Sequence, residues 1–283
     1  MAQVDLHLHT TASDGRLTPA KLVALVANRG LRVVAITDHD STEGLAEALE
    51  AAGTFPNLTI IPGIELSSDI PGKEVHILGY FIRYSDESFQ QTLRQFRVDR
   101  LERARKMVDN LSNMGLPVDW ERVLELAGGA VGRPHIAQAM VEKGYVSLPQ
   151  DAFAKYIGRN GPAYAERPKL TPGDAVRMIR RVDGLAVLAH PLEVGELSDL
   201  DTIIPDLRAA GLAGMEVHYG SYTPSQVETL AAIADREGLV PCGGSDYHAL
   251  GTPGEVEPGQ VGPPLESADR LFAMAGTRVD LRL

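Results

Sequence analysis

Seven short runs of apolar and β-branched residues recur along the 283-residue chain and alternate with stretches of helical character. The runs are Val4–Leu8, Leu31–Thr37, Leu58–Ile61, Glu74–Phe81, Leu185–Ala189, Gly214–His218 and Leu239–Gly243. This alternation is typical of repeated βα units around a parallel sheet. Thr18-Pro19, Thr171-Pro172 and Thr223-Pro224 each place a capping hydroxyl before a proline, so they predict helix starts. We therefore predict an α/β fold of the (β/α)7 barrel type, with functional groups at the carboxyl ends of the strands.

The alternation stops between residues 85 and 168, where no convincing strand pattern is found. This stretch predicts one long charged helix and two shorter ones, at Glu87–Gly115, Trp120–Ala127 and Pro134–Gly144. We interpret residues 85–168 as a helical insertion over the mouth of a barrel that is built from residues 1–84 and 169–283.

Charge and composition narrow the functional classes. The net charge of -11 argues against a general nucleic-acid-binding surface, so we expect no stable binding of duplex nucleic acid. No apolar run approaches the ~20 residues that cross a bilayer, and the N-terminus shows no signal-peptide pattern, so we expect a cytoplasmic protein without a membrane partner. The single cysteine, Cys242, cannot form an internal disulfide or a thiolate cluster. Any metal is therefore expected on nitrogen and oxygen ligands, which favours manganese, zinc or iron.

Six of the eight histidines fall at or just beyond the ends of predicted strands, together with several acidic residues. His7 and His9 are two apart, so in a strand their imidazoles point to the same face and can bind one ion. The other members of the pattern are Asp14, His39, Glu65, His76, His190, Asp246 and His248. Any one such histidine is more often an ordinary packed or hydrogen-bonded residue. It is much less probable that the whole set lies at strand ends by chance, so the set predicts a metal site.

These motifs resemble the PHP (polymerase and histidinol phosphatase) family over nearly the whole chain. The resemblance implies a distorted, TIM-like (β/α)7 barrel with a trinuclear site and metal-dependent phosphoesterase activity. Carried over by position, the first ion lies on His7, His9, Glu65 and Asp246, the second on Glu65, His76 and His190, and the third on Asp14, His39 and His248. Glu65 is the natural bridge, because a carboxylate can offer one oxygen to each of two ions whereas an imidazole ordinarily donates one nitrogen.

The implied chemistry needs no serine or cysteine nucleophile. Metal-bound water has a pKa lowered towards ~7, so hydroxide held between ions can attack phosphorus. We expect three divalent ions, with manganese first and zinc or iron as alternatives. Asp38 and Asp40 are interpreted as groups that orient imidazoles, with a surface position as the alternative for Asp40. For His218 we favour packing or hydrogen bonding over metal binding.

The predicted insertion carries basic residues that suit a phosphate. Arg94, Arg97, Arg100 and Arg103 recur every three residues along the long helix. Arg94 fits a solvated face, whereas Arg100 and Arg103 are candidates for substrate binding, because a guanidinium binds phosphate oxygens as a fork. In a further motif, Gly132-Arg133-Pro134-His135, the proline opens a helix whose N-terminus favours an anion. Arg133 and His135 flank that end and are also candidates, although an ordinary capped helix start remains the alternative.

This Arg-x-His element resembles the PHP subgroup that dephosphorylates nucleoside 3′,5′-bisphosphates and trims short RNA from its 5′ end, in which the insertion grips the phosphate that is not cleaved. The predicted substrate is therefore a small phosphorylated nucleotide or short oligonucleotide, cleaved at the 3′-phosphate of a nucleoside 3′,5′-bisphosphate. One alternative is a histidinol-phosphate phosphatase, although arginines would repel its cationic amine. Others are a noncatalytic PHP interaction module and a binuclear amide or ester hydrolase that shares the His-x-His start.

Overall fold

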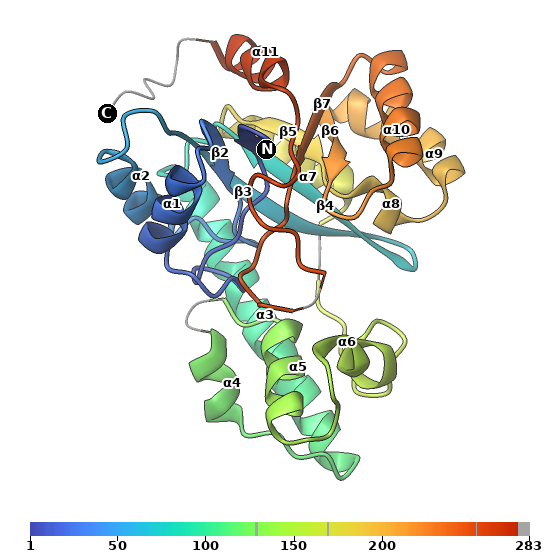
Figure 1. Cartoon of the computed structure of the whole chain (residues 1–283). Coiled ribbons are helices and arrows are strands. Elements are labelled where there is room, and N and C mark those ends of the chain that lie inside the picture. The colour runs from blue at the N-terminus through green and yellow to red at the C-terminus, as the bar shows by residue number, and fades with distance from the viewer. Residues whose placement is uncertain (128–129, 169, 253, 277–283) are drawn as a thin grey trace.

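A computed structural model describes residues 1–127, 130–168, 170–252 and 254–276. Within them, seven strands form one sheet in chain order: β1 (Val4–Asp5), β2 (Val33–Ile36), β3 (Thr59–Ile70), β4 (Lys73–Tyr80), β5 (Leu185–Leu188), β6 (Leu212–Tyr219) and β7 (Val240–Gly244). The first and last strands meet, because the Leu6 N–H donates to the Gly243 carbonyl at 3.0 Å. A bridge between Leu8 and Tyr247 continues this contact. The sheet is thus a nearly closed barrel, and the predicted α/β barrel is confirmed (Figure 1).

The prediction of seven parallel βα units is wrong at β4. This strand runs antiparallel to both β3 and β5, and a tight turn at Pro71-Gly72 replaces the expected helix between β3 and β4. Gly72 has a φ of 83°, which glycine adopts without strain in such a turn. Because β3 continues to Ile70 instead of ending near Ile61, Glu65 lies inside a strand and not after one.

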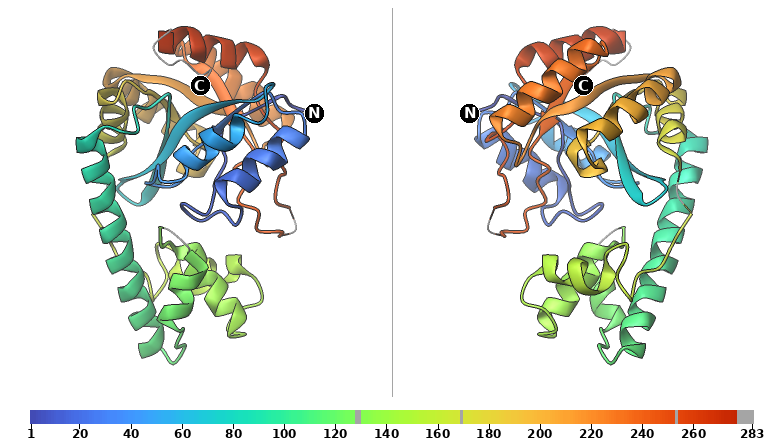
Figure 2. Two further views of the ribbon diagram at one scale, coloured as in Figure 1. Left: turned by 90° about the vertical axis from the view of Figure 1, so that its left-hand side faces the viewer. Right: turned by 90° about the vertical axis from the view of Figure 1, so that its right-hand side faces the viewer.

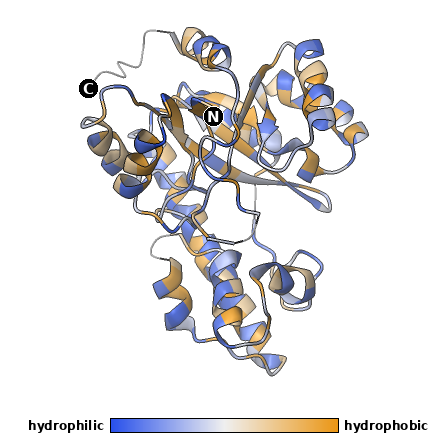
Figure 3. Ribbon diagram, viewed as in Figure 1, coloured by the Kyte–Doolittle hydropathy of each residue, from blue (hydrophilic) through white to orange (hydrophobic). Residues whose placement is uncertain are grey.

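Helices surround the barrel on its outer side: α1 (Pro19–Asn28), α2 (Leu45–Ala52), α7 (Pro172–Arg181), the short α8 (Pro191–Val194), α9 (Leu197–Ala210) and α10 (Pro224–Arg236). The last helix, α11 (Leu265–Ala275), lies at the end of the barrel opposite the segment between β4 and β5 (Figure 1). The three predicted caps are confirmed, since Thr18, Thr171 and Thr223 each accept a backbone N–H from the first turn of their helix. Most of these helices carry both apolar and polar stretches (Figure 3). The apolar faces of all of them except α11 pack on the sheet in one large cluster. Ala268 and Leu271 of α11 belong to a second cluster with strand side chains such as Leu6 and Val187. Among the described residues, no helix combines the length and the apolar composition that crossing a bilayer requires.

The segment between β4 and β5 is helical, as predicted. Its elements are α3 (Glu87–Asn113), α4 (Trp120–Ala127), α5 (Arg133–Glu142), α6 (Pro149–Ala152) and the π-helical turn η1 (Phe153–Ile157). α3 leads away from the barrel, and the shorter helices lie beside its far half, facing the loops at one end of the barrel (Figures 1 and 2). Apolar side chains of this segment form a cluster of their own, which includes Met107, Leu111, Ile136 and Met140. The boundaries of the insertion at residues 85 and 168 stay a prediction.

The closure between β7 and β1 leaves no room for a side chain at Gly244. A Cβ placed there would lie 2.5 Å from the His7 nitrogen and 2.6 Å from Asp5 Oδ1. We predict that Gly244→Ala lowers the free energy of unfolding by about 3 kcal/mol, because overpacking forces the backbones apart. Urea unfolding measures this, with Gly173→Ala in α7 as a neutral control, since its new methyl group would meet only the Arg177 side chain at 3.4 Å. If the two variants unfold at the same urea concentration, β7 and β1 do not pack tightly at Gly244.

Candidate metal centre and adjoining cavities

All nine predicted metal ligands come together at the end of the barrel that faces the insertion. Glu65 stands at the centre, with both of its oxygens close to imidazoles. Oε2 lies 3.2 Å from His7 Nε2, 3.3 Å from His9 Nε2 and 3.0 Å from His39 Nδ1. Oε1 lies 2.8 Å from His76 Nδ1 and 3.1 Å from His190 Nε2. One buried carboxylate therefore faces five imidazoles from four segments of the barrel, because His7 and His9 both follow β1.

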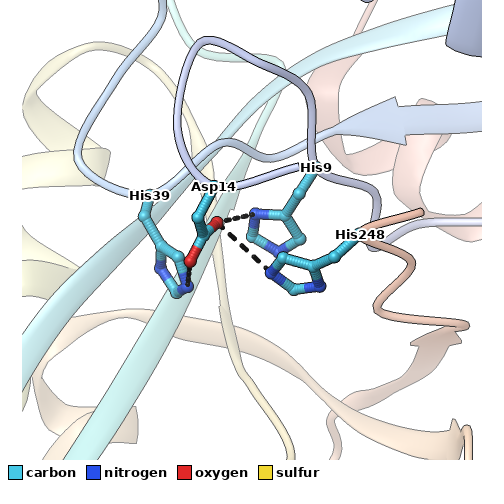
Figure 4. A group of neighbouring side chains, drawn as sticks. All are labelled: His9, Asp14, His39 and His248. Atoms are coloured by element: carbon cyan, nitrogen blue, oxygen red, sulfur yellow. Dashed lines mark ion pairs between the residues drawn. The ribbon is translucent and has the colours of Figure 1, made fainter. Parts of the chain in front are cut away.

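Asp14 is the centre of a second group (Figure 4). Its Oδ1 lies 3.3 Å from His248 Nε2 and 3.7 Å from His9 Nδ1, and its Oδ2 lies 3.8 Å from His39 Nε2. Asp38 shapes the loop that carries Asp14, because it accepts hydrogen bonds from the Thr10 backbone N–H and hydroxyl, both at 2.7 Å, and from the Ser13 hydroxyl at 2.6 Å. The prediction that Asp38 orients an imidazole is therefore wrong.

The donor set fits divalent cations. Several buried ring nitrogens and carboxylate oxygens lie near charged atoms but in no contact with the geometry of a hydrogen bond within the described residues: His9 Nδ1 and Nε2, Asp14 Oδ1, His39 Nδ1, His76 Nδ1 and His190 Nδ1. Burial alone would raise the pKa of Glu65, but the imidazoles of His39 and His7 hold it well below its usual value. The carboxylate is thus anionic and suits a cation. Buried polar atoms without partners are costly, and metal coordination would satisfy them.

Three sets of ligand atoms lie close enough together to share an ion. They are His9, Asp14, His39 and His248; His7, His9 and Asp246; and His39, Glu65 and His76. Each set overlaps one of the three predicted ligand groups without matching it fully. The first set adds His9, the second lacks Glu65, and the third has His39 in place of His190. The assignment of individual ligands to three ions stays a prediction.

A small cavity of about 80 Å³ adjoins the imidazoles of His39 and His76. Four arginines line it: Arg100 and Arg103 from α3, Arg133 from the start of α5, and Arg167 from the segment that returns to the barrel. Three of them have acidic partners. Arg100 Nε and Arg167 Nη2 donate to Asp40 at 2.8 and 3.0 Å, and Arg133 Nη2 donates to Glu74 at 2.6 Å.

Arg103 is different, because its buried Nε and Nη1 have no hydrogen-bond partner in the described residues. Burial, and after it the charge of the neighbouring Arg100, lower the pKa of Arg103 to about 9. Unpaired guanidinium donors in a buried, positively charged cavity favour an anion.

Arg94, on the same helix, is exposed, as predicted.

The fourth predicted substrate-binding residue, His135, lies apart from this lining. Its Nδ1 accepts the Gly132 N–H at 2.9 Å and so caps the start of its own helix. A role of His135 in substrate binding stays a prediction.

A larger cavity of about 310 Å³ also adjoins the ligand cluster. It shares Asp14, His39, His76, Pro134 and Phe153 with the arginine-lined cavity. Arg16 also lines this cavity and links the helical segment to the barrel. Its guanidinium donates to Gln138 Oε1 in α5 at 2.8 Å and to the Leu250 carbonyl, in the loop after β7, at 3.1 Å.

Four residues beside the site were missed by the sequence reasoning: Ser67, Arg167, Glu216 and Tyr219. Arg167 and Ser67 carry no recognisable motif. Glu216 did carry a signal, since it is a lone acid in an otherwise apolar strand. Asp40 was noticed, but its predicted roles are wrong, because it is fully buried and binds arginines, not imidazoles.

A seven-stranded barrel with a His/Asp/Glu cluster at the ends of its strands, beside an arginine-lined cavity, defines a metal-dependent phosphoesterase. The PHP domain family matches residues 5–148, and the chain belongs to that family. The predicted family, hydrolase class and barrel are confirmed.

Relatives and solved structures are similar along most of the chain. The 3′,5′-nucleoside bisphosphate phosphatase of Chromobacterium violaceum is 35% identical over 258 residues, which are 90% of each chain. The 5′-3′ exoribonuclease Rnm of Escherichia coli is 35% identical and is matched over 84% of its length by 86% of this chain. A solved metal-dependent phosphoesterase of Bifidobacterium adolescentis is 31% identical, with a TM-score of 0.87 and 98% of each chain covered.

Proposed function

We propose that this protein hydrolyses the 3′-phosphate of nucleoside 3′,5′-bisphosphates, and that the same site trims short 5′-phosphorylated RNA. The observation that carries the proposal is the arginine-lined cavity next to the ligand cluster, in which Arg103 keeps buried donors without partners. A substrate with two phosphates can place one at the ligand cluster and the other in this cavity. The names of the relatives from C. violaceum and E. coli support the same substrate class.

The ligand cluster would hold the ions through the nine residues that the sequence predicts. We propose three divalent ions, with manganese as the first candidate and zinc or iron as alternatives. When bound, such ions lower the pKa of water and neutralise phosphate oxygens. The chain's own arginines would orient the phosphate that is not cleaved, and the larger cavity would hold the nucleoside between Phe153 and the loop at Leu250.

A second candidate function is hydrolysis of another phosphate ester at the same site. The name of an Eggerthella lenta relative, a phosphoribosyl 1,2-cyclic phosphate 1,2-diphosphodiesterase that is 34% identical, favours including a phosphodiester among the tested compounds. Histidinol phosphate is disfavoured, because guanidinium groups would repel its amine.

The deciding experiment compares phosphate release by manganese-loaded protein from adenosine 3′,5′-bisphosphate, adenosine 5′-monophosphate and histidinol phosphate. We expect the highest kcat/KM for the bisphosphate. A preference for histidinol phosphate, or equal rates for all three compounds, would contradict the proposal.

Arg103 provides a sharper test. We predict that Arg103→Met lowers kcat/KM for adenosine 3′,5′-bisphosphate by roughly 10- to 100-fold, because charge-assisted hydrogen bonds to the second phosphate are lost. Hydrolysis of adenosine 3′-monophosphate, which lacks that phosphate, should change little. Arg94→Met, on the exposed side of the same helix, is the matched control. Equal losses on both substrates would mean that Arg103 supports the fold and does not bind the second phosphate.

A further inference from the structure

Strand β6 supplies none of the nine predicted metal ligands, yet two of its side chains contact three of them. Glu216 is fully buried; its Oε1 lies 3.1 Å from His7 Nδ1, and its Oε2 accepts the backbone N–H of His190 at 2.8 Å. The Tyr219 hydroxyl donates to Asp246 Oδ2 at 2.8 Å. β6 therefore holds side chains or backbone from the ends of β1, β5 and β7.

An irregularity in β6 makes both contacts available. Residues three apart in a regular strand point to opposite faces. Here the register against β7 shifts between Glu216, which pairs with Cys242, and His218, which pairs with Gly243. A bulge of this kind re-aims side chains and is common next to active sites. It allows Glu216 and Tyr219 to reach the same site.

The two partners of Glu216 fix the chemistry of its contacts. A backbone N–H can only donate, so the His190 contact needs an acceptor oxygen. A carboxylate accepts at both oxygens, so Glu216 pairs with the His7 tautomer that carries its proton on Nδ1. The other ring nitrogen, Nε2, is then left with its lone pair, and it lies 3.2 Å from Glu65 Oε2 and from Asp246 Oδ1.

The His190 contact also holds an unusual backbone. His190 has a φ of 27° and a ψ of 60°, in the left-handed region that residues other than glycine rarely adopt. Such a conformation persists only where surrounding contacts hold it. The hydrogen bond to Glu216 is one of these contacts, and it directs the ring so that Nε2 lies 3.1 Å from Glu65 Oε1.

We infer that Glu216 is a positioning residue that sets the tautomer of His7 and the backbone of His190, and thereby the ligands of two of the three ions. Tyr219 positions Asp246 in the same way. This inference rests on the proposed metal centre. It adds that a strand without ligands determines how tightly the metal centre is held.

The test is Glu216→Gln, which keeps the shape of the side chain. A carboxamide has one acceptor oxygen, so it cannot accept from both the His7 ring and the His190 N–H. Its NH2 group can only donate, which favours the tautomer of His7 that carries its proton on Nε2. We expect manganese affinity to fall about 10- to 100-fold at the sites that use His7 and His190. The ion held by Asp14, His39 and His248 should stay bound. Equilibrium dialysis with elemental analysis gives the bound manganese per chain, and the visible spectrum of the cobalt-substituted protein reports ligand geometry.

Two further variants separate positioning from a general loss of stability. Leu22→Ala leaves a cavity at a fully buried position of α1, a helix that supplies none of the predicted ligands. It should lower the melting temperature while metal binding is kept. Tyr219→Phe keeps the ring and should change the cobalt spectrum and weaken binding of a single ion, so the inference stays testable if Glu216→Gln does not fold.

The outcomes are distinct. Wild-type metal content and an unchanged cobalt spectrum in Glu216→Gln and Tyr219→Phe would overturn the inference. If wild-type protein binds metal but hydrolyses another phosphate ester faster than the bisphosphate, the proposed substrate is wrong. The inference about Glu216 is unaffected by that result. If wild-type protein takes up no divalent metal, both fail.

Discussion

Replacing Glu65 with glutamine is expected to lower kcat for phosphate ester hydrolysis by about 1,000-fold or more. The carboxylate lies at 2.8–3.3 Å from five imidazoles, so every predicted ligand group depends on its position or its charge. Glutamine keeps the shape but removes the negative charge and one of the two acceptor oxygens. Steady-state rates and the metal content of the purified protein measure the effect together.

The matched control for this substitution is Glu237→Gln, which alters an ion pair of Glu237 with Arg236, a side chain that is 55% exposed. It should leave kcat within about twofold of the wild type, since exposed ion pairs contribute little. A Glu65→Gln protein that keeps more than a tenth of the wild-type rate with a full metal complement would show that the carboxylate is not a bridging ligand.

Asp40→Asn is expected to lower the free energy of unfolding by about 3–5 kcal/mol at pH 7. Asp40 is fully buried and accepts hydrogen bonds from Arg100, Arg167 and the Ser67 N–H. Its loss leaves two guanidinium groups without their counter-charge. The matched control is Asp174→Asn, whose ion pair with Arg177 is about half exposed and should cost less than about 1 kcal/mol.

The effect of Asp40→Asn should also depend on pH. Burial raises the pKa of Asp40, but Arg100 and Arg167 outweigh burial and hold the pKa well below its usual value. A carboxylate with a lowered pKa stabilises the fold above its ordinary pKa of about 3.9, and this contribution is lost as the pH falls. The difference in the free energy of unfolding between the wild type and Asp40→Asn should therefore become smaller below about pH 4. Urea unfolding at pH 7 and pH 3 measures it, and a constant difference would contradict the ionic role.

The sequence could predict features that depend on neighbouring residues. Capping threonines before prolines located the starts of α1, α7 and α10, and the runs of apolar residues located the seven strands. Features that depend on distant contacts were missed. The polar run Ser67-Ser68-Asp69 hid the second half of β3, because these residues lie where the strand passes beside the insertion.

The errors at the site have the same origin. Asp40 binds Arg167, which is 127 positions away in the chain, so no local pattern could reveal the pair. The bulge in β6 likewise separates Glu216 from His218, although alternation alone would put both on one face. The nine candidate ligands were easier to single out, because most of them come within short motifs just after a strand. Glu65 and His76 are the exceptions, since they lie inside β3 and β4.

The separate apolar clusters of the barrel and of the helices around α3 have a consequence for how such an enzyme can diversify. Substitutions among Met107, Leu111 and Ile136 repack only their own cluster, so drift there need not disturb the histidines of the barrel. If the proposed function holds, selection can therefore reshape the surface that meets the substrate while the hydrolytic chemistry is inherited unchanged. A library randomised only in the helical cluster should accordingly yield altered ester preferences far more often than lost metal binding.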